Sequence, residues 1–310
     1  MSVEIVVRFL EENLYAEHFI NYYLQLGFDH IHILFEKNQE PLRIENEKVS
    51  VIVHDYLGND VFCHLKTLLS TTAEWIFFCD ADEYLYLKEY PTIQRFLETV
   101  PTDIEQIFFQ WAMIENYSYM TEKQDLFDCL STHKMYANPY IKSMVRYSCV
   151  GEKNITPHYC ENIVKNYIWN KSFTTSAVSI MSDDSVDNYS NTTYPFIIHF
   201  HTRSIQNIFI KGLKTNFVHS GKHMDVSKLN ECIAEKDVLT IRRFTKLALP
   251  LHHSKGSIIH LPVSLKGPLI HFDLENDQLY KICKSKEIDF KELIKIIKAL
   301  DILYTDYFRQ

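Results

Sequence analysis

The stretch WIFFCDADEYL, residues 75–85, decides the fold of this chain of 310 residues. Its first half is a continuous apolar run, which is the pattern of a strand buried on both faces of a parallel sheet. The run ends in three carboxylates, Asp80, Asp82 and Glu83. Because doubly wound parallel sheets bind ligands beyond the carboxyl ends of their strands, we expect these carboxylates at the binding edge of the sheet.

Strand and helix patterns alternate on either side of this stretch. Runs rich in β-branched residues predict strands, and apolar residues at helical spacing predict helices between them. The order strand, helix, strand, strand, helix, strand predicts an α/β fold with a mainly parallel, doubly wound, Rossmann-like sheet. The predicted strands are 3–10, 30–36, 49–55, 75–80 and 104–114, and the predicted helices are 13–27 and 60–72.

The second half of the chain is less regular. Residues 115–195 are polar, with short strands such as 140–148, and a strand at 196–204 leads into a helix that Ser204 would cap. Helical periodicity returns at 236–249 and 290–308. The sequence therefore predicts an α/β domain over residues 1–225 and a smaller, mostly helical appendage over residues 226–310.

Composition excludes several classes of function. A net charge of -8 argues against a nucleic-acid-binding surface, and only 7 glycines with no Gly-rich motif argue against a phosphate loop. The 7 cysteines form no C-x-x-C pair, which is typical of reduced thiols. No signal peptide or long apolar run is visible, so we expect a cytoplasmic protein without a transmembrane segment. The helix at 290–308 predicts a packed C-terminal helix, and weak contact with the inner membrane surface is the alternative.

The three carboxylates after the buried strand repel one another unless a cation or hydrogen-bond donors neutralise them. Oxygen ligands favour hard cations, and Mg²⁺ typically takes one or two carboxylates and completes its shell with water and phosphate oxygens. The D-x-D pattern of Asp80 and Asp82 therefore predicts Mn²⁺ or Mg²⁺ bridging to a diphosphate. The alternative is a solvated acidic loop, or acidic residues at the start of a helix.

A second constellation is HFHTRS, residues 199–204. His199, His201 and Arg203 alternate along one face of a predicted strand, and Lys211 follows in the next helix. Imidazole and guanidinium groups together suit a metal ligand beside a phosphate contact, although a lone histidine is more often structural.

A third set of charged and histidine side chains occurs in and after the β-like run that begins near residue 140. Lys142, Arg146 and His158 are placed to meet an anionic substrate, although each alone is more often a surface charge.

These motifs, in this order, resemble the family-2-like glycosyltransferases close to glycosyltransferase family 92, over about residues 4–215. The most specific part is W-x-x-x-x-D-x-D-E-[FY]-L from Trp75 to Leu85, followed by H-[YF]-x-x-[RK]-S from His199 to Ser204. The chain departs from the family in two places. The opening N-E-x-x-[YI]-x-E-W is kept only loosely in residues 11–18, and W-x-x-F-G is reduced to Trp111 and Met113.

The resemblance implies a GT-A fold and a nucleotide-sugar donor, usually a UDP-sugar, with Mn²⁺ or Mg²⁺ on its diphosphate. It implies that Asp80 faces the ribose and the metal, that Asp82 ligates the metal, and that His199 is a further ligand with His201 as the alternative. Glu11, in the loosely kept opening motif, is a further candidate for nucleotide binding.

The resemblance also implies how charge and protons are handled. Arg203, Lys211 and Lys142 are the candidates to stabilise the departing diphosphate. An inverting enzyme needs a base for the acceptor hydroxyl, and Glu115 is the first candidate, ahead of Asp125 and Asp128. For a transferase with reduced thiols and no visible signal peptide, we expect a glycan acceptor of the polysaccharide or lipopolysaccharide type.

Two other functions remain open from the sequence. Another metal enzyme acting on nucleotides, such as a nucleotidyltransferase or a phosphohydrolase, also uses D-x-D. A catalytically degenerate GT-A-like module that binds a nucleotide or a glycan is the second, because the two family motifs named above are incomplete.

Overall fold

The structure is a computed structural model that describes most of the chain. The described residues are 1–9, 12–37, 42–56, 58–115, 124–125, 127, 135–151, 155–156, 158–173, 194–213, 230–231, 233–235, 269–270 and 272–308. They form two compact units, a first unit of Met1–Met113 with Ala137–His199, and a second unit of Ile114–Tyr136 with Phe200–Gln310. The domain boundary predicted at residues 225 and 226 lies outside the described residues.

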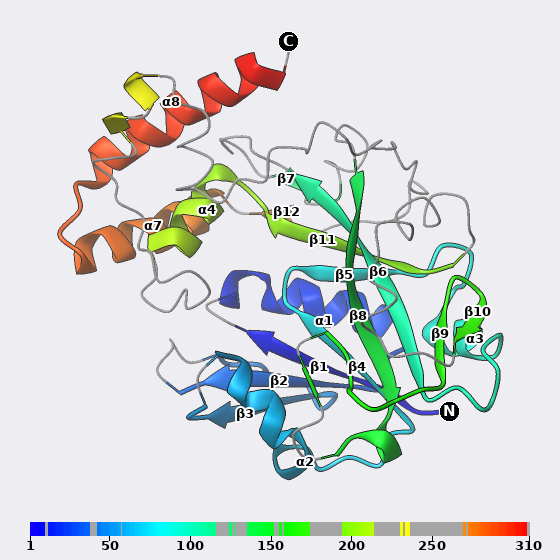
Figure 1. Cartoon of the computed structure of the whole chain (residues 1–310). Helices are drawn as coiled ribbons and strands as arrows, with labels where there is room; N and C mark the ends of the chain where they lie inside the picture. Colours follow the sequence, from blue (N-terminus) through cyan, green and yellow to red (C-terminus); the bar gives the residue numbers. More distant parts are fainter. Residues whose placement is uncertain are drawn as a thin grey trace. The chain divides into compact units, whose positions relative to one another are not determined.

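The first unit is built on a parallel core of four strands (Figure 1). They are β1 (Val3–Phe9), β2 (His30–Glu36), β3 (Val49–His54) and β4 (Trp75–Asp80), in the order β4-β1-β2-β3. All three neighbouring pairs are parallel. The predicted α/β fold with a mainly parallel, Rossmann-like sheet is confirmed.

Further strands extend this sheet on the other side of β4. β8 (Met135–Arg146) pairs with β4 in the antiparallel direction and neighbours β6 (Gln106–Glu115). β9 (Asn166–Ile168) follows parallel to β6, and β10 (Lys171–Phe173) forms a hairpin with β9. A short strand β5 (Glu83–Tyr86) pairs with β11 (Phe196–Thr202). The strand predicted at 140–148 is confirmed over residues 140–146, which belong to a longer strand of 12 residues. Residues 147 and 148 lie instead in a 3-10 turn.

Helices cover both faces of the parallel core. η1 (Asn13–Tyr15) and α1 (Ala16–Gln25) place Phe19 and Tyr23 against the face that carries Phe77. η2 (Gly58–His64) and α2 (Leu65–Leu68) pack on the face that carries Phe78. Neighbouring residues of a strand point to opposite faces, so the two groups of helices lie on opposite sides of the sheet. A short helix α3 (Ile93–Leu97) and a 3-10 turn η4 (Tyr147–Cys149) complete the first unit.

The helix predicted at 60–72 differs from the structure. The segment is a 3-10 helix followed by one turn of α-helix, and it ends at Leu68. Three threonines, Thr67, Thr71 and Thr72, follow one another closely, and such β-branched side chains weaken a helix. The apolar residues of the segment are nevertheless buried as the amphipathic pattern requires.

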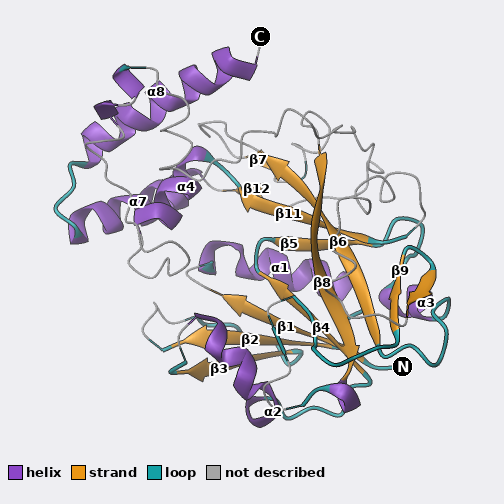
Figure 2. Ribbon diagram, viewed as in Figure 1, coloured by secondary structure: helices purple, strands orange, loops and turns teal. Residues whose placement is uncertain are grey.

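The second unit contains α4 (Ile205–Leu213), α7 (Phe272–Ser285) and α8 (Phe290–Phe308), which share one apolar core (Figure 2). Two short strands, β7 (Gln124–Asp125) and β12 (Leu269–Ile270), pair with each other. Ser204 accepts a hydrogen bond from the backbone N–H of Asn207 (3.0 Å), so its predicted role as N-cap is confirmed.

The helix predicted at 290–308 coincides with α8. Its apolar stripe of Leu293, Ile296, Ile297 and Leu300 is buried in the second unit, as expected for a packed helix. The predicted helix at 236–249 lies outside the described residues. Among the described helices, none has the length and apolar character needed to cross a membrane.

Candidate functional site

The carboxylates that opened the sequence analysis lie at the carboxyl end of the parallel strands of the first unit. Asp80 is the last residue of β4 and stands beside Arg8 of β1 in the strand register. Glu83 turns back and accepts a hydrogen bond from the backbone N–H of Asp80 (2.8 Å). Tyr23 of α1 donates to the carbonyl of Glu83 and accepts from the N–H of Leu85. Glu83 and Tyr23 therefore position the acidic turn.

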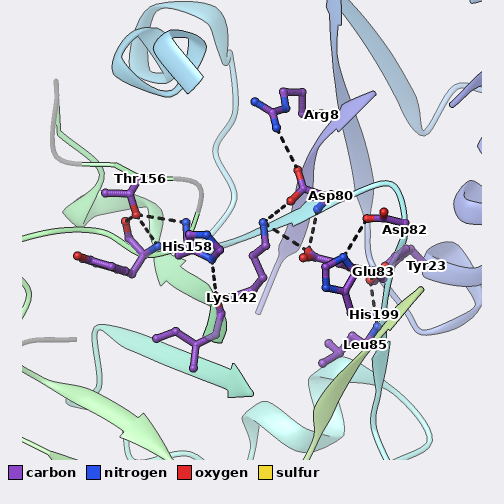
Figure 3. A network of polar contacts seen from close by, with 12 residues as sticks. Arg8, Tyr23, Asp80, Asp82, Glu83, Leu85, Lys142, Thr156, His158 and His199 are labelled. Atoms are coloured by element: carbon purple, nitrogen blue, oxygen red, sulfur yellow. Dashed lines mark hydrogen bonds and ion pairs between the residues drawn. The ribbon is translucent and has the colours of Figure 1, made fainter. Parts of the chain in front are cut away.

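A lysine from another strand supplies the countercharge (Figure 3). Nζ of Lys142, on β8, lies 2.6 Å from Oδ2 of Asp80 and 3.5 Å from Oε2 of Glu83. The guanidinium of Arg8 lies 3.7 Å from the other oxygen of Asp80. Lys142 is 1% exposed and Glu83 is 0% exposed, so both lie in the protein interior, whereas the side chain of Asp80 is 29% exposed.

Burial and these charges divide the carboxylates into two kinds. Burial alone would raise the pKa of Asp80, but the charges of Lys142 and Arg8 bring that pKa below its ordinary value. Burial raises the pKa of Glu83 well above its usual range, and Lys142 offsets this only in part. Burial lowers the pKa of Lys142, but Asp80 and Glu83 raise it further, so the lysine stays charged. The cations of the protein thus relieve the repulsion: Asp80 stays ionised beside Lys142 and Arg8, whereas burial disfavours the charged form of Glu83.

Asp82 faces a different partner. Nε2 of His199, on β11, lies 3.5 Å from Oδ1 of Asp82, and both side chains are largely buried. The pairing of β11 with β5 sets His199 opposite Glu83, which explains why the histidine reaches the acidic turn.

The pair of Asp82 and His199 is the part of the site that fits a divalent cation. Within the described residues, no group of three His, Cys, Asp or Glu side chains could hold a metal ion. Asp80, one of the predicted ligands, is instead engaged by Lys142 and Arg8. Two protein ligands nevertheless suffice for Mg²⁺ when phosphate oxygens and water complete its shell. Asp82 and His199 would hold such an ion, and a bound diphosphate would have to supply further ligands.

Aromatic rings lie next to the charged groups. Trp111 of β6, Tyr140 of β8 and His158 form a set that we call the ring cluster. The ring centroid of Trp111 lies 5.4 Å from those of both Tyr140 and His158, and 4.3 Å from that of His199. Nζ of Lys142 lies 5.8 Å from the centroid of Trp111. The cluster therefore borders both the ion pair of Lys142 and the pair of Asp82 and His199.

A second group of polar side chains lies at the ends of β2 and β3, on the other side of β1 from Asp80. Glu36 ends β2 and stands opposite His54, which ends β3, and both side chains are buried. Tyr56 follows, with its ring stacked on that of His64 at a centroid distance of 3.9 Å. Burial lowers the pKa of His54, so its ring is neutral at pH 7.

Sequence reasoning did not select Trp111, Tyr140, Glu36 or His54 as site residues. One signal was present for Tyr140, because it precedes Lys142 by two positions and so shares its face of the strand. Glu36 and His54 each end a predicted parallel strand, which is the same argument that selected Asp80.

Other predicted residues are placed less completely. Arg203 is fully buried and belongs to the second unit. Glu115 ends β6, His201 lies in β11, Lys211 in α4 and Asp125 in β7, but their side chains lie outside the described part of the chain. Glu11 and Asp128 lie outside it altogether. The structure thus brings together Asp80, Asp82, Glu83, Lys142 and His199, all in the first unit.

Comparisons with known proteins give limited likenesses. No protein-family model matches the chain, and no curated protein matches it. Among solved structures, HddC from Yersinia pseudotuberculosis is 10% identical, with a TM-score of 0.31 over 52% of this chain and 83% of that chain. Its complex with GMP-PN is 11% identical, with a TM-score of 0.30 over 60% of this chain and 97% of that chain. The 4-diphosphocytidyl-2C-methyl-D-erythritol synthase of Anaerococcus prevotii is 11% identical, with a TM-score of 0.26 over 48% and 73%. Since these TM-scores are low, we base the functional proposal on the side chains of this chain.

Proposed function

We propose that this chain is a glycosyltransferase that moves a sugar from a nucleotide-sugar, a UDP-sugar by the family resemblance, to a hydroxyl group of a glycan acceptor. The observation that carries the proposal is the arrangement of Asp80 with Lys142, and of Asp82 with His199, at the carboxyl edge of a parallel sheet. This edge is where doubly wound sheets bind nucleotides.

The order of the strands suggests how the donor lies. Asp80 ends β4, and β1, β2 and β3 follow in that order toward Glu36 and His54. Neighbouring strands lie about 4.8 Å apart, so three steps span roughly 14 Å, which accommodates a nucleoside. The nucleobase would lie toward the ends of β2 and β3, and the diphosphate at Asp82 and His199.

The residues around the diphosphate have separate tasks. A divalent cation held by Asp82 and His199 would neutralise charge on the leaving diphosphate. Lys142 and Arg8 keep Asp80 ionised and fixed, so that it can accept hydrogen bonds from the ribose. The acceptor hydroxyl attacks the anomeric carbon, the bond from that carbon to the diphosphate breaks, and the diphosphate leaves with the electron pair. The hydroxyl proton passes to a base, for which Glu115 is the candidate.

A thermal-shift panel tests the proposal directly. UDP-, GDP-, CMP- and dTDP-sugars are each added with and without Mn²⁺, because ligands that bind only the native state raise the melting temperature. We expect a metal-dependent rise with UDP-sugars that is lost in Asp82→Asn and kept in Asp103→Asn, a change at an exposed aspartate of the first unit. No rise with any donor, in protein shown to be folded, would contradict the proposal.

Turnover separates the transferase from its nearest alternatives. Release of free nucleotide diphosphate together with a glycosylated product supports transfer. Binding of the donor without any turnover would identify a nucleotide-binding module, and a nucleotide product without sugar transfer would identify a nucleotidyltransferase or a phosphohydrolase.

A further inference from the structure

Tyr140 is the exposed member of the ring cluster of Trp111, Tyr140 and His158. Tyr140 is 47% exposed, which is unusual for a large aromatic side chain that contacts two other rings. Its ring is nearly parallel to that of His158, with an interplanar angle of 29° and a centroid distance of 5.8 Å. A half-exposed aromatic side chain beside buried charges suits a ligand that is apolar on one side and polar on the other.

His158 adds a hydrogen-bond acceptor with a defined tautomer. Its Nδ1 lies 2.9 Å from the carbonyl oxygen of Ile141. A carbonyl can only accept, so Nδ1 carries the proton and Nε2 is the nitrogen with the free lone pair. Burial, and then the charge of Lys142, lower the pKa of His158, so the ring stays neutral at pH 7. No donor from the described residues forms a hydrogen bond with Nε2.

Trp111 contributes a donor. Its Nε1 is shielded from solvent and has no hydrogen-bond acceptor among the described residues. The ring cluster therefore combines aromatic faces with one acceptor and one donor that the described protein groups do not use. This combination suits a ligand that carries several hydroxyl groups on a ring.

The place of the cluster in the sheet separates it from the nucleobase. Trp111 and Tyr140 come from β6 and β8, which lie on one side of β4, whereas Glu36 and His54 come from β2 and β3, on the other side. With the diphosphate at the end of β4, the nucleobase and the ring cluster lie in opposite directions along the sheet edge. The ring cluster therefore lies on the side of the diphosphate away from the nucleobase, which is where the proposed function requires the acceptor to bind.

We propose that the ring cluster is the subsite for the acceptor, and that it binds a hexopyranose ring with its C–H face on Tyr140 and one hydroxyl group hydrogen-bonded to Nε2 of His158. The role of this sugar as the acceptor rests on the proposed function. The binding of a sugar ring to the ring cluster can be measured without a donor.

Saturation-transfer difference NMR with methyl glycosides of glucose, galactose, mannose and N-acetylglucosamine tests the subsite. Signals on ring C–H protons are expected for at least one glycoside with the wild-type protein. Tyr140→Ala should weaken this binding roughly fivefold, because the stacking contact of an aromatic ring contributes about 1 kcal/mol beyond buried area. Tyr140→Phe keeps the ring and should keep the signal.

Tyr280→Ala is the matched control, because Tyr280 is 48% exposed and belongs to α7 of the second unit. It should leave the signal unchanged, and the melting temperature of each variant reports on folding. His158→Phe keeps a ring but removes Nε2, and should weaken binding less than Tyr140→Ala does.

Three outcomes would overturn the inference. They are no glycoside signal with folded wild-type protein, an equal signal in Tyr140→Ala, and loss of UMP base-proton signals in Tyr140→Ala, which would show that the rings hold a nucleobase. The proposed function is tested separately. Glycoside binding at the ring cluster without any donor-induced thermal shift would support the sugar subsite and contradict the proposed transferase activity.

Discussion

Nζ of Lys142 lies 2.6 Å from Oδ2 of Asp80, although the two residues are 62 positions apart in the chain. The contact exists because β8 runs antiparallel to β4 and brings the lysine to the end of the parallel strand. The first carboxylate of the D-x-D motif therefore has a cation that belongs to the protein itself. The second carboxylate, on Asp82, faces His199.

Replacing Lys142 by Met should destabilise the first unit by about 3 kcal/mol, because Asp80 loses its nearer cation and keeps only the more distant Arg8. Unfolding in urea, followed by circular dichroism, measures the change. Lys295→Met is the matched control, since Lys295 forms an exposed ion pair with Glu292 on α8 that should contribute less than about 1 kcal/mol. The double variant Lys142→Met with Asp80→Asn should recover part of the loss, and equal losses in the single and double variants would show that the pair is not coupled.

Replacing Glu115 by Gln should lower the rate of sugar transfer about 100-fold or more, the usual contribution of a general base. Donor binding, measured by thermal shift, should not change, because the substitution removes a proton acceptor and keeps a similar shape. Glu105→Gln, just before the opposite end of β6, serves as the control and should leave both quantities unchanged. Unimpaired transfer by the Glu115 variant would exclude Glu115 as the base.

His30 should make stability depend on pH below about 6.5. Burial, and then the neighbouring His32, lower the pKa of His30 from its ordinary value of 6.5. The unfolded chain therefore binds more protons than the native state just below that pH, so the free energy of unfolding falls as the pH falls. Histidines titrate between about pH 7 and pH 5, so urea unfolding is measured over this range. The free energy of unfolding should decline less steeply for His30→Gln than for wild type. Parallel curves for the two proteins would contradict the assignment.

Replacing Glu287 by Gly should stabilise the second unit by about 1 kcal/mol. Glu287, two residues after the end of α7, has φ of 58°, and the N–H of Ile288 donates to the carbonyl of Cys283 (3.0 Å). This is the left-handed position at a helix end where glycine is favoured. Lys284→Gly, inside the last turn of α7, is the control and should destabilise by a similar amount. Thermal unfolding of both variants gives the two signs, and a lower melting temperature for Glu287→Gly would refute the explanation.

The predictions from sequence succeeded where the signal is local. The run before Asp80 marks a buried strand because its residues are apolar without interruption, and the structure places that strand in the parallel core. Ser204 caps its helix and residues 290–308 form α8, because capping and helical periodicity depend on residues a few positions apart. The helix predicted at 60–72 was too long. The spacing of apolar residues alone does not show where β-branched threonines weaken and end a helix.

By itself, the sequence determined that a parallel α/β sheet presents Asp80, Asp82 and Glu83 at a strand end. The burial of a strand and the place where it ends depend on consecutive residues, so a local pattern predicts both. Only the tertiary structure decided which groups meet them: Lys142 from the antiparallel strand β8 and His199 from β11. Trp111 of β6 lies beside both of these partners. Pairing between distant strands follows from the packing of the whole sheet, and no local periodicity encodes it. For the same reason, the division of the acidic turn into a lysine-bound Asp80 and an Asp82 facing His199 is a property of the folded chain alone.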